Sequence, residues 1–129
     1  MTRINVVPPE ELVREHLIAE YRELPRVFTA VQAAQKRGLT PATVGIPSAY
    51  VLGTGHMKFF YDKCQFLLRR QQALIREIRS RGFNANHGYP NDLLNGLEPH
   101  WLNDWEPTEM ALYLNRLRIR ERLEAKDKK

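Results

Sequence analysis

The residue types that could do chemistry gather on one predicted helix. They are His16, Ala19, Glu23 and Arg26, spaced i, i+3, i+7 and i+10, with Arg22 flanking Glu23. At about 3.6 residues per turn these four positions share one helix face. A carboxylate beside arginines and a histidine has two interpretations. It is either a surface ion-pair network that stabilises the fold modestly, or an acid or base held in an anion-binding face.

The amino terminus offers a second reactive group. Thr2 is small, so we expect the initiator methionine to be removed and Thr2 to carry the free α-amine. An α-amine has a pKa of about 7.7–8.0 and lysine one near 10.4, so the uncharged fraction at neutral pH is on the order of 300-fold larger for the α-amine. Such an amine can form an imine without being buried. Most N-terminal threonines have no such role, so the amine alone establishes no activity.

The charge of the chain is compatible with a polyanionic partner. The 129 residues include 20 Lys and Arg against 15 Asp and Glu, a formal net charge of +5. Residues 56–82 hold 7 basic and 2 acidic side chains, which fits either a solvated face or a nucleic-acid-binding face. The single cysteine, Cys64, excludes a disulfide framework and an all-cysteine zinc site. We expect no metal and no cofactor.

No hydrophobic segment marks the chain for a membrane. No apolar run approaches the roughly 18 residues of a transmembrane helix, and the basic amino terminus is not followed by an apolar signal region. The sequence therefore predicts a soluble protein of the cytoplasm.

Hydrophobic periodicity predicts an all-α fold with three main helices in one compact domain, residues 1–129. The expected helices cover residues 9–37, residues 56–81, and residues 107 onward, with long Pro- and Gly-containing connections between them. Residues 49–52 are a weak strand candidate. Pro25 lies inside the first helix and predicts a bend near Tyr21.

Each predicted helix has an apolar side that should face the core. For the first helix these residues are Val13, Leu17, Tyr21, Leu24, Phe28 and Val31; for the second they are Phe60, Cys64, Leu67, Leu74 and Ile78; for the third they are Met110, Tyr113, Leu114 and Leu117. Cys64 is accordingly expected to be a core residue rather than a reactive thiol.

Two blocks of sequence carry a family resemblance. They are MTRIN at residues 1–5 and HLIAEYRELPRVF at residues 16–28, and the similarity continues at residues 52–56, 59–63 and 81–84 and at Gln71. These blocks resemble the phage pyrimidine-dimer DNA glycosylase/AP lyase family, often called phage endonuclease V. The similarity fades across residues 85–105 and returns weakly from Pro107.

The resemblance implies a repair enzyme that acts on damaged double-stranded DNA as a monomer. The Thr2 amine would attack the sugar C1′ at the 5′ base of a cyclobutane pyrimidine dimer and form a covalent imine. Glu23 would assist and would support β-elimination of the 3′ phosphate. The resemblance also implies DNA contacts by several basic side chains, which are Arg3, His16, Arg22, Arg26, Arg118 and Arg122.

The chain departs from the phage relatives in ways that concern the lesion. Its C-terminus lacks their aromatic tail, and its two tryptophans, Trp101 and Trp105, lie in an acidic connection instead. Two alternatives therefore stay open. The protein could be an AP-site lyase or a glycosylase for another damaged base, or it could be a basic helical module that binds DNA without catalysis.

Overall fold

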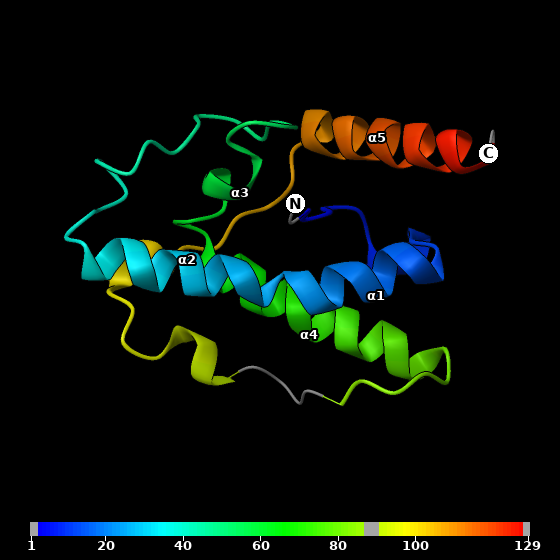
Figure 1. Ribbon diagram of the computed structural model, residues 1–129, viewed down its shortest axis with the longest axis horizontal. Helices are drawn as coiled ribbons and strands as arrows, with labels where there is room; N and C mark the ends of the chain where they lie inside the picture. Colours follow the sequence, from blue (N-terminus) through cyan, green and yellow to red (C-terminus); the bar gives the residue numbers. More distant parts are fainter. Residues whose placement is uncertain (1–2, 87–90, 128–129) are drawn as a thin grey trace.

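The computed structural model describes residues 3–86 and 91–127, and this part of the chain is helical with no strand. The all-α prediction is confirmed. The elements in chain order are the 3-10 turn η1 (Pro9–Glu11), α1 (Arg14–Glu23), α2 (Pro25–Lys36), α3 (His56–Phe59), α4 (Cys64–Ser80), the 3-10 turns η2 (Asn91–Leu94) and η3 (Pro99–Trp101), and α5 (Glu109–Asp127). In Figure 1, α1 and α2 run end to end above α4, and α5 lies along the opposite side of the N-terminal segment.

The predicted first helix, residues 9–37, is divided into three pieces. Residues 9–11 form a single 3-10 turn, Leu12 and Val13 are extended, and α1 begins only at Arg14. The second division is at Pro25, which has no N–H for the carbonyl of Tyr21, so α1 ends and α2 starts there. The interruption lies at Leu24, which keeps right-handed helical dihedrals (φ −53°, ψ −41°), so the bend near Tyr21 stays a prediction, and the early start of the helix was wrong.

The other element boundaries also differ from the prediction. The second helix is interrupted between α3 and α4, where Lys63 leaves helical geometry (φ −125°, ψ 39°) and pairs with Leu102 in an isolated β-bridge. The third helix starts at Glu109 rather than residue 107. The strand candidate at residues 49–52 is wrong. Tyr50 in that segment is buried among Phe59, Phe60 and His56 instead.

Both long helices end at the glycines that the sequence marks as stops. Gly38 and Gly82 adopt φ values of +83° and +86°, which favour glycine because a Cβ atom is strained there. The residue after each glycine donates a backbone hydrogen bond to the last turn of its helix, Leu39 to Ala34 at 3.0 Å and Phe83 to Ile78 at 3.1 Å. This is the Schellman arrangement, and it directs the chain away from each helix end.

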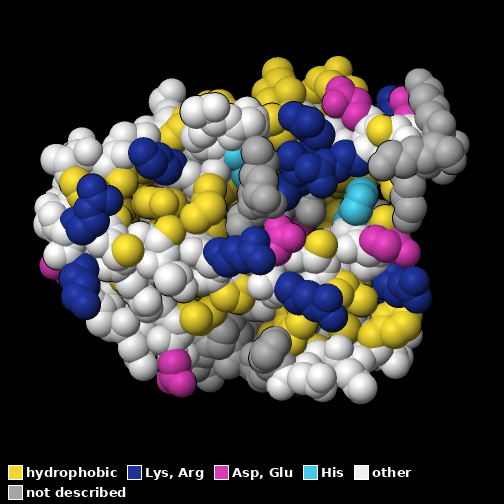
Figure 2. Space-filling model, in the orientation of Figure 1, with side chains coloured by type: hydrophobic (Ala, Val, Ile, Leu, Met, Phe, Trp, Pro, Cys, Tyr) yellow, Lys and Arg dark blue, Asp and Glu magenta, His cyan; other side chains and the backbone are white. Residues whose placement is uncertain are grey.

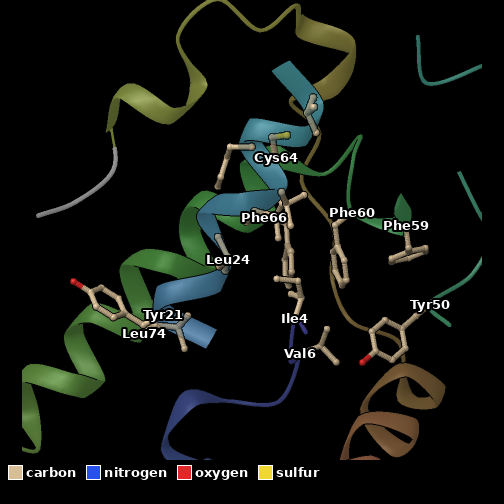
Figure 3. Close-up of a cluster of buried hydrophobic side chains, with 14 of the residues drawn as sticks. Ile4, Val6, Tyr21, Leu24, Tyr50, Phe59, Phe60, Cys64, Phe66 and Leu74 are labelled. Carbon is tan, nitrogen blue, oxygen red and sulfur yellow. The ribbon is translucent and has the colours of Figure 1, made fainter. Parts of the chain in front are cut away.

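The core lies between α1, α2 and α4 and includes the N-terminal segment, residues 4–7 (Figure 3). The apolar sides predicted for the first two helices are buried, apart from the half-buried Val13. Cys64 is a core residue, as expected, and burial raises its pKa to about 12. Trp101 is also completely buried, so it is a core residue rather than a surface contact.

The apolar side predicted for the third helix is wrong for two of its four residues, whereas Leu114 packs against the core and Leu117 is half-buried. Met110 and Tyr113 are 63% and 61% exposed, whereas Ala111 and Asn115 are buried. Asn115 on the buried face bonds the N-terminal segment, so the side of α5 that packs inward combines this polar residue with apolar ones. The N-terminal segment is thereby enclosed between α5 on one side and α1 and α4 on the other.

Candidate active site

A pocket opens where α1, the N-terminal segment and α5 meet. Its lining consists of Arg3, Asn5, His16, Ala19, Glu20, Glu23, Ile119 and Arg122. On this side of the molecule Lys and Arg side chains gather around acidic and histidine side chains (Figure 2). The three elements that enclose the pocket come from the two ends of the sequence, so the pocket exists only in the folded protein.

Two carboxylates of α1 line this pocket, and they differ in their hydrogen-bond partners. Glu20 is buried and accepts hydrogen bonds from two of the three Arg70 guanidinium nitrogens, Nε at 2.8 Å and Nη2 at 3.0 Å, and from Asn5 Nδ2 at 2.9 Å. Glu23 is half-buried, and none of the described residues gives it a hydrogen bond or an ion pair. Glu20 is therefore a structural anion, and the Glu23 carboxylate is available for an incoming group.

Three arginines meet above these carboxylates. Arg3 keeps two buried guanidinium nitrogens, Nε and Nη1, without a hydrogen-bond partner in the described part of the chain, and Arg118 keeps its Nε in the same state. Burial lowers the pKa of Arg3, and the positive charges of Arg122 and Arg118 lower it further. Buried donors without partners are costly, and guanidinium groups match the oxygens of phosphate. The cluster of Arg3, Arg118 and Arg122 is thus suited to an anion.

Tyr50 adds a neutral donor next to this cluster. Its hydroxyl is buried without a partner among the described residues, and burial raises its pKa to about 12. The charges of Arg3 and Arg118 act on it as well. The hydroxyl stays protonated at neutral pH and can donate to an oxyanion.

His56 fixes the chain close to this site. The Ile4 amide donates to His56 Nε2 at 3.0 Å, so Nδ1 carries the ring hydrogen and donates to the Val51 carbonyl at 2.9 Å. Burial, more than any other cause, lowers the pKa of His56. The imidazole is therefore neutral at pH 7, and it ties the N-terminal segment to the loop that precedes α3.

The site residues expected from the sequence are not all brought together. Arg3, His16, Glu23 and Arg122 line one pocket, and Arg118 adjoins it through its interaction with Arg3. Arg22 lines a separate pocket with Asn84 and Asn86. Arg26 is exposed at the start of α2 and does not line the pocket of Glu23. Thr2 lies outside the described residues.

Sequence patterns did not single out Asn5, Tyr50, His56 and Asn115, which build the surroundings of the pocket. Three of them, Asn5, His56 and Asn115, bond partners far away in the sequence, and the Asn115 contacts with Val6 and Val7 span 109 and 108 residues. The sequence offered one signal, which was an asparagine within the apolar pattern of the last helix. A polar residue at such a position is rarely buried without a hydrogen-bond partner, so it indicates a specific contact.

The described residues contain no group of three His, Cys, Asp or Glu side chains that could hold a metal ion. None of the described helices is long and apolar enough to cross a membrane.

A family model for pyrimidine dimer DNA glycosylases matches residues 1–91. The chain belongs to this family. It is a DNA glycosylase of DNA repair, and its substrate is DNA. The matched region of the glycosylase includes Arg3, His16 and Glu23, together with the Glu20–Arg70 pair that underlies them. Arg118 and Arg122 on α5 lie beyond the matched region, and the fold places them at the same pocket.

Proposed function

We propose that this glycosylase cleaves the 5′ glycosidic bond of cyclobutane pyrimidine dimers with the Thr2 α-amine and then acts as an AP lyase. The observation that carries the proposal is that Glu23, which has no hydrogen-bond or ion-pair partner among the described residues, lines one pocket with Arg3. Thr2 directly precedes Arg3, and consecutive Cα atoms are about 3.8 Å apart. The chain connection alone therefore keeps Thr2 next to a residue of the pocket, which supports a role for its amine there.

The first step requires an uncharged amine and a stabilised sugar cation. The positive charges of Arg3, Arg118 and Arg122 disfavour the protonated amine and so raise the fraction that can attack. The amine lone pair forms a bond to C1′ while the C1′–N bond to the 5′ pyrimidine breaks, with its electrons going to the base. Positive charge builds on the sugar as this bond breaks, and the Glu23 carboxylate stabilises it.

The second step is β-elimination from the imine. The new ammonium nitrogen first loses a proton, which the departing base takes up. Its lone pair then forms the C=N bond as the C1′–O4′ bond breaks and O4′ takes a proton from water, and the resulting protonated imine makes the C2′ proton acidic. Glu23 is the group in the pocket that supports removal of this proton, after which the C3′–O bond breaks and the 3′ phosphate leaves. Water then hydrolyses the imine and releases the enzyme. The arginines hold the phosphates on either side of the lesion throughout.

The lesion itself lowers the cost of access to C1′. An enzyme that reaches this atom in a duplex has to bend the DNA or extrude a nucleotide, and a damaged, poorly paired step reduces the energy required. We further propose that the enzyme acts as a monomer in the cytoplasm, and a pocket lined by Arg3, Glu23 and Arg122 of one chain is consistent with a monomer.

Borohydride trapping tests this proposal. Duplexes that carry a cyclobutane dimer, an AP site or no lesion are incubated with the enzyme and borohydride, and the intact mass of the same preparation shows whether Met1 is absent. We expect covalent adducts on the first two duplexes, mapped to Thr2, and none on the third. A matched enzyme with one extra N-terminal residue before Thr2 should form neither adduct.

The other outcomes separate the competing interpretations. An adduct on the AP site alone identifies an AP-site lyase and refutes dimer cleavage. Absence of both adducts in a preparation without Met1 refutes the imine mechanism and leaves a module that binds DNA.

A further inference from the structure

Asn115 stands at the contact between α5 and the N-terminal segment. It is completely buried, on the inner face of the helix. Its Oδ1 accepts two backbone hydrogen bonds, from Val6 at 2.7 Å and Val7 at 3.1 Å, and its Nδ2 donates to Asn5 Oδ1 at 2.8 Å. One side chain thus takes up two consecutive backbone amides and a third polar group of the same segment.

The contact continues from Asn115 into the helices below. Asn5 Nδ2 donates to Glu20 at 2.9 Å, and Arg70 holds Glu20 with two further hydrogen bonds and also donates to the Val7 carbonyl. At its other end the segment is fixed by the hydrogen bond from Ile4 to His56. Every residue from Ile4 to Val7 is therefore held by at least one side chain from a distant part of the chain.

The helix that supplies Asn115 also supplies cations to the pocket. Arg118 and Arg122 follow Asn115 by three and seven residues, so all three lie on one face of α5. Arg3 faces these two arginines from the N-terminal segment, and their positive charges repel it. The hydrogen bonds of Asn115 therefore hold together two elements whose charged side chains push apart until an anion lies between them.

We propose that Asn115 is a positioning residue for the reaction. It fixes the distance between the arginines of α5 and the N-terminal segment, so that binding of a DNA phosphate to Arg118 and Arg122 places the amine of Thr2 against the sugar. The inference rests on the proposed function, because the group being positioned is the Thr2 amine. Asn115 itself is enclosed by the segment and does not contact substrate.

Single-turnover kinetics of Asn115→Ser test this role. Serine keeps the position polar but is too short to bridge Val6, Val7 and Asn5. The rate of borohydride trapping on an AP-site duplex is measured at saturating enzyme, together with the dissociation constant for a duplex carrying a reduced AP site. A small displacement of a reacting group costs up to about 100-fold in rate. We expect trapping to slow by roughly 10- to 100-fold, while the dissociation constant changes by less than about 3-fold.

Ala111→Gly is the matched control. Ala111 is buried one turn before Asn115 on the same helix face, and glycine there loosens α5 by about 1 kcal/mol without removing a hydrogen bond of the segment. Trapping by this variant should stay within about 3-fold of the unmodified enzyme at a temperature where both are folded. Asn5→Ser is a milder second variant. It removes the link to Glu20 but leaves Val6 and Val7 bound to Asn115, and we expect an intermediate loss of rate.

The outcomes distinguish the inference from the proposed function. Normal trapping by folded Asn115→Ser, or an equal loss in Ala111→Gly, overturns the positioning role and leaves the imine mechanism intact. No trapping by the unmodified enzyme overturns the mechanism, and the positioning role with it.

Discussion

Gln71 on α4 donates a hydrogen bond from Nε2 to the backbone carbonyl of Tyr21 on α1, at 3.0 Å. In an uninterrupted helix that carbonyl would accept from residue 25, but residue 25 is proline and has no N–H. Gln71 is buried, so its side chain replaces the missing donor inside the core. Gln71 thus ties α4 to the last turn of α1, next to the junction with α2 and two residues before Glu23.

A double-mutant cycle measures how far the Gln71 side chain compensates for the backbone N–H that Pro25 lacks. Gln71→Leu leaves the Tyr21 carbonyl buried and unsatisfied, so we expect it to lower the free energy of unfolding by about 1–3 kcal/mol. In a Pro25→Ala background the backbone N–H restored at this position can bond to the Tyr21 carbonyl, so the same change should cost less. Urea unfolding of the four proteins gives the coupling energy. Equal costs in both backgrounds would show that Gln71 stabilises the core independently of Pro25.

The two glutamates of α1 should respond differently to loss of charge. Glu23→Gln removes a carboxylate that has no partner among the described residues, so the free energy of unfolding should change by less than about 0.5 kcal/mol. Cleavage of AP-site DNA should nevertheless be lost, because the amide can neither take the C2′ proton nor stabilise the sugar cation. Strand cleavage and unfolding are measured on the same preparation.

Glu20→Gln is the control for this pair. It leaves Arg70 as an unpaired buried charge, and breaking a buried ion pair costs about 3–5 kcal/mol. We expect this variant to be much less stable than the Glu23 variant. Normal strand cleavage by Glu23→Gln would contradict the role assigned to Glu23.

The contrast between Glu20 and Glu23 shows which part of the site could be predicted from the sequence. The periodicity of α1 correctly predicted that His16, Ala19 and Glu23 share a face, because it depends only on local helix geometry. Which carboxylate is already neutralised depends on Arg70, which lies 50 residues away from Glu20. Local spacing contains no information about that partner.

In the last helix, α5, even the buried side could not be predicted reliably from local periodicity. Met110 and Tyr113 of its predicted apolar side face outward, while Asn115 faces inward and bonds backbone amides of the N-terminal segment. An amphipathic pattern identifies the buried side only when the docking surface is apolar. The position of Asn115 within an apolar pattern could mark it as a buried polar residue, but the backbone amides that it binds could be identified only from the fold.

The arginines of α5 should determine how strongly binding depends on salt. For B-DNA, log K falls with log salt by about 0.9 for each phosphate contact. If Arg122 holds one phosphate, Arg122→Gln should reduce the magnitude of this slope by about 0.9 on an AP-analogue duplex. Arg120→Gln is the control with the same charge change, because Arg120 lines a different surface with Tyr113 and Glu109. An equal change of slope in both variants would indicate a diffuse charge effect instead.

His56 should make the stability of the glycosylase depend on pH. Its pKa is lowered from the ordinary value of 6.5, chiefly by burial, and its Nε2 accepts the Ile4 N–H only while the ring is neutral. Below about pH 6.5 the unfolded chain binds a proton that the folded protein does not, so the free energy of unfolding falls, at most by about 1.4 kcal/mol per pH unit. Above that pH the contribution of neutral His56 to the free energy of unfolding is complete.

Urea unfolding between pH 5 and pH 8 should therefore show a shallower pH dependence for His56→Gln than for the unmodified enzyme. His100 is exposed, so His100→Gln should follow the unmodified enzyme. Parallel curves for His56→Gln and the unmodified enzyme would mean that His56 does not anchor the N-terminal segment through its neutral form.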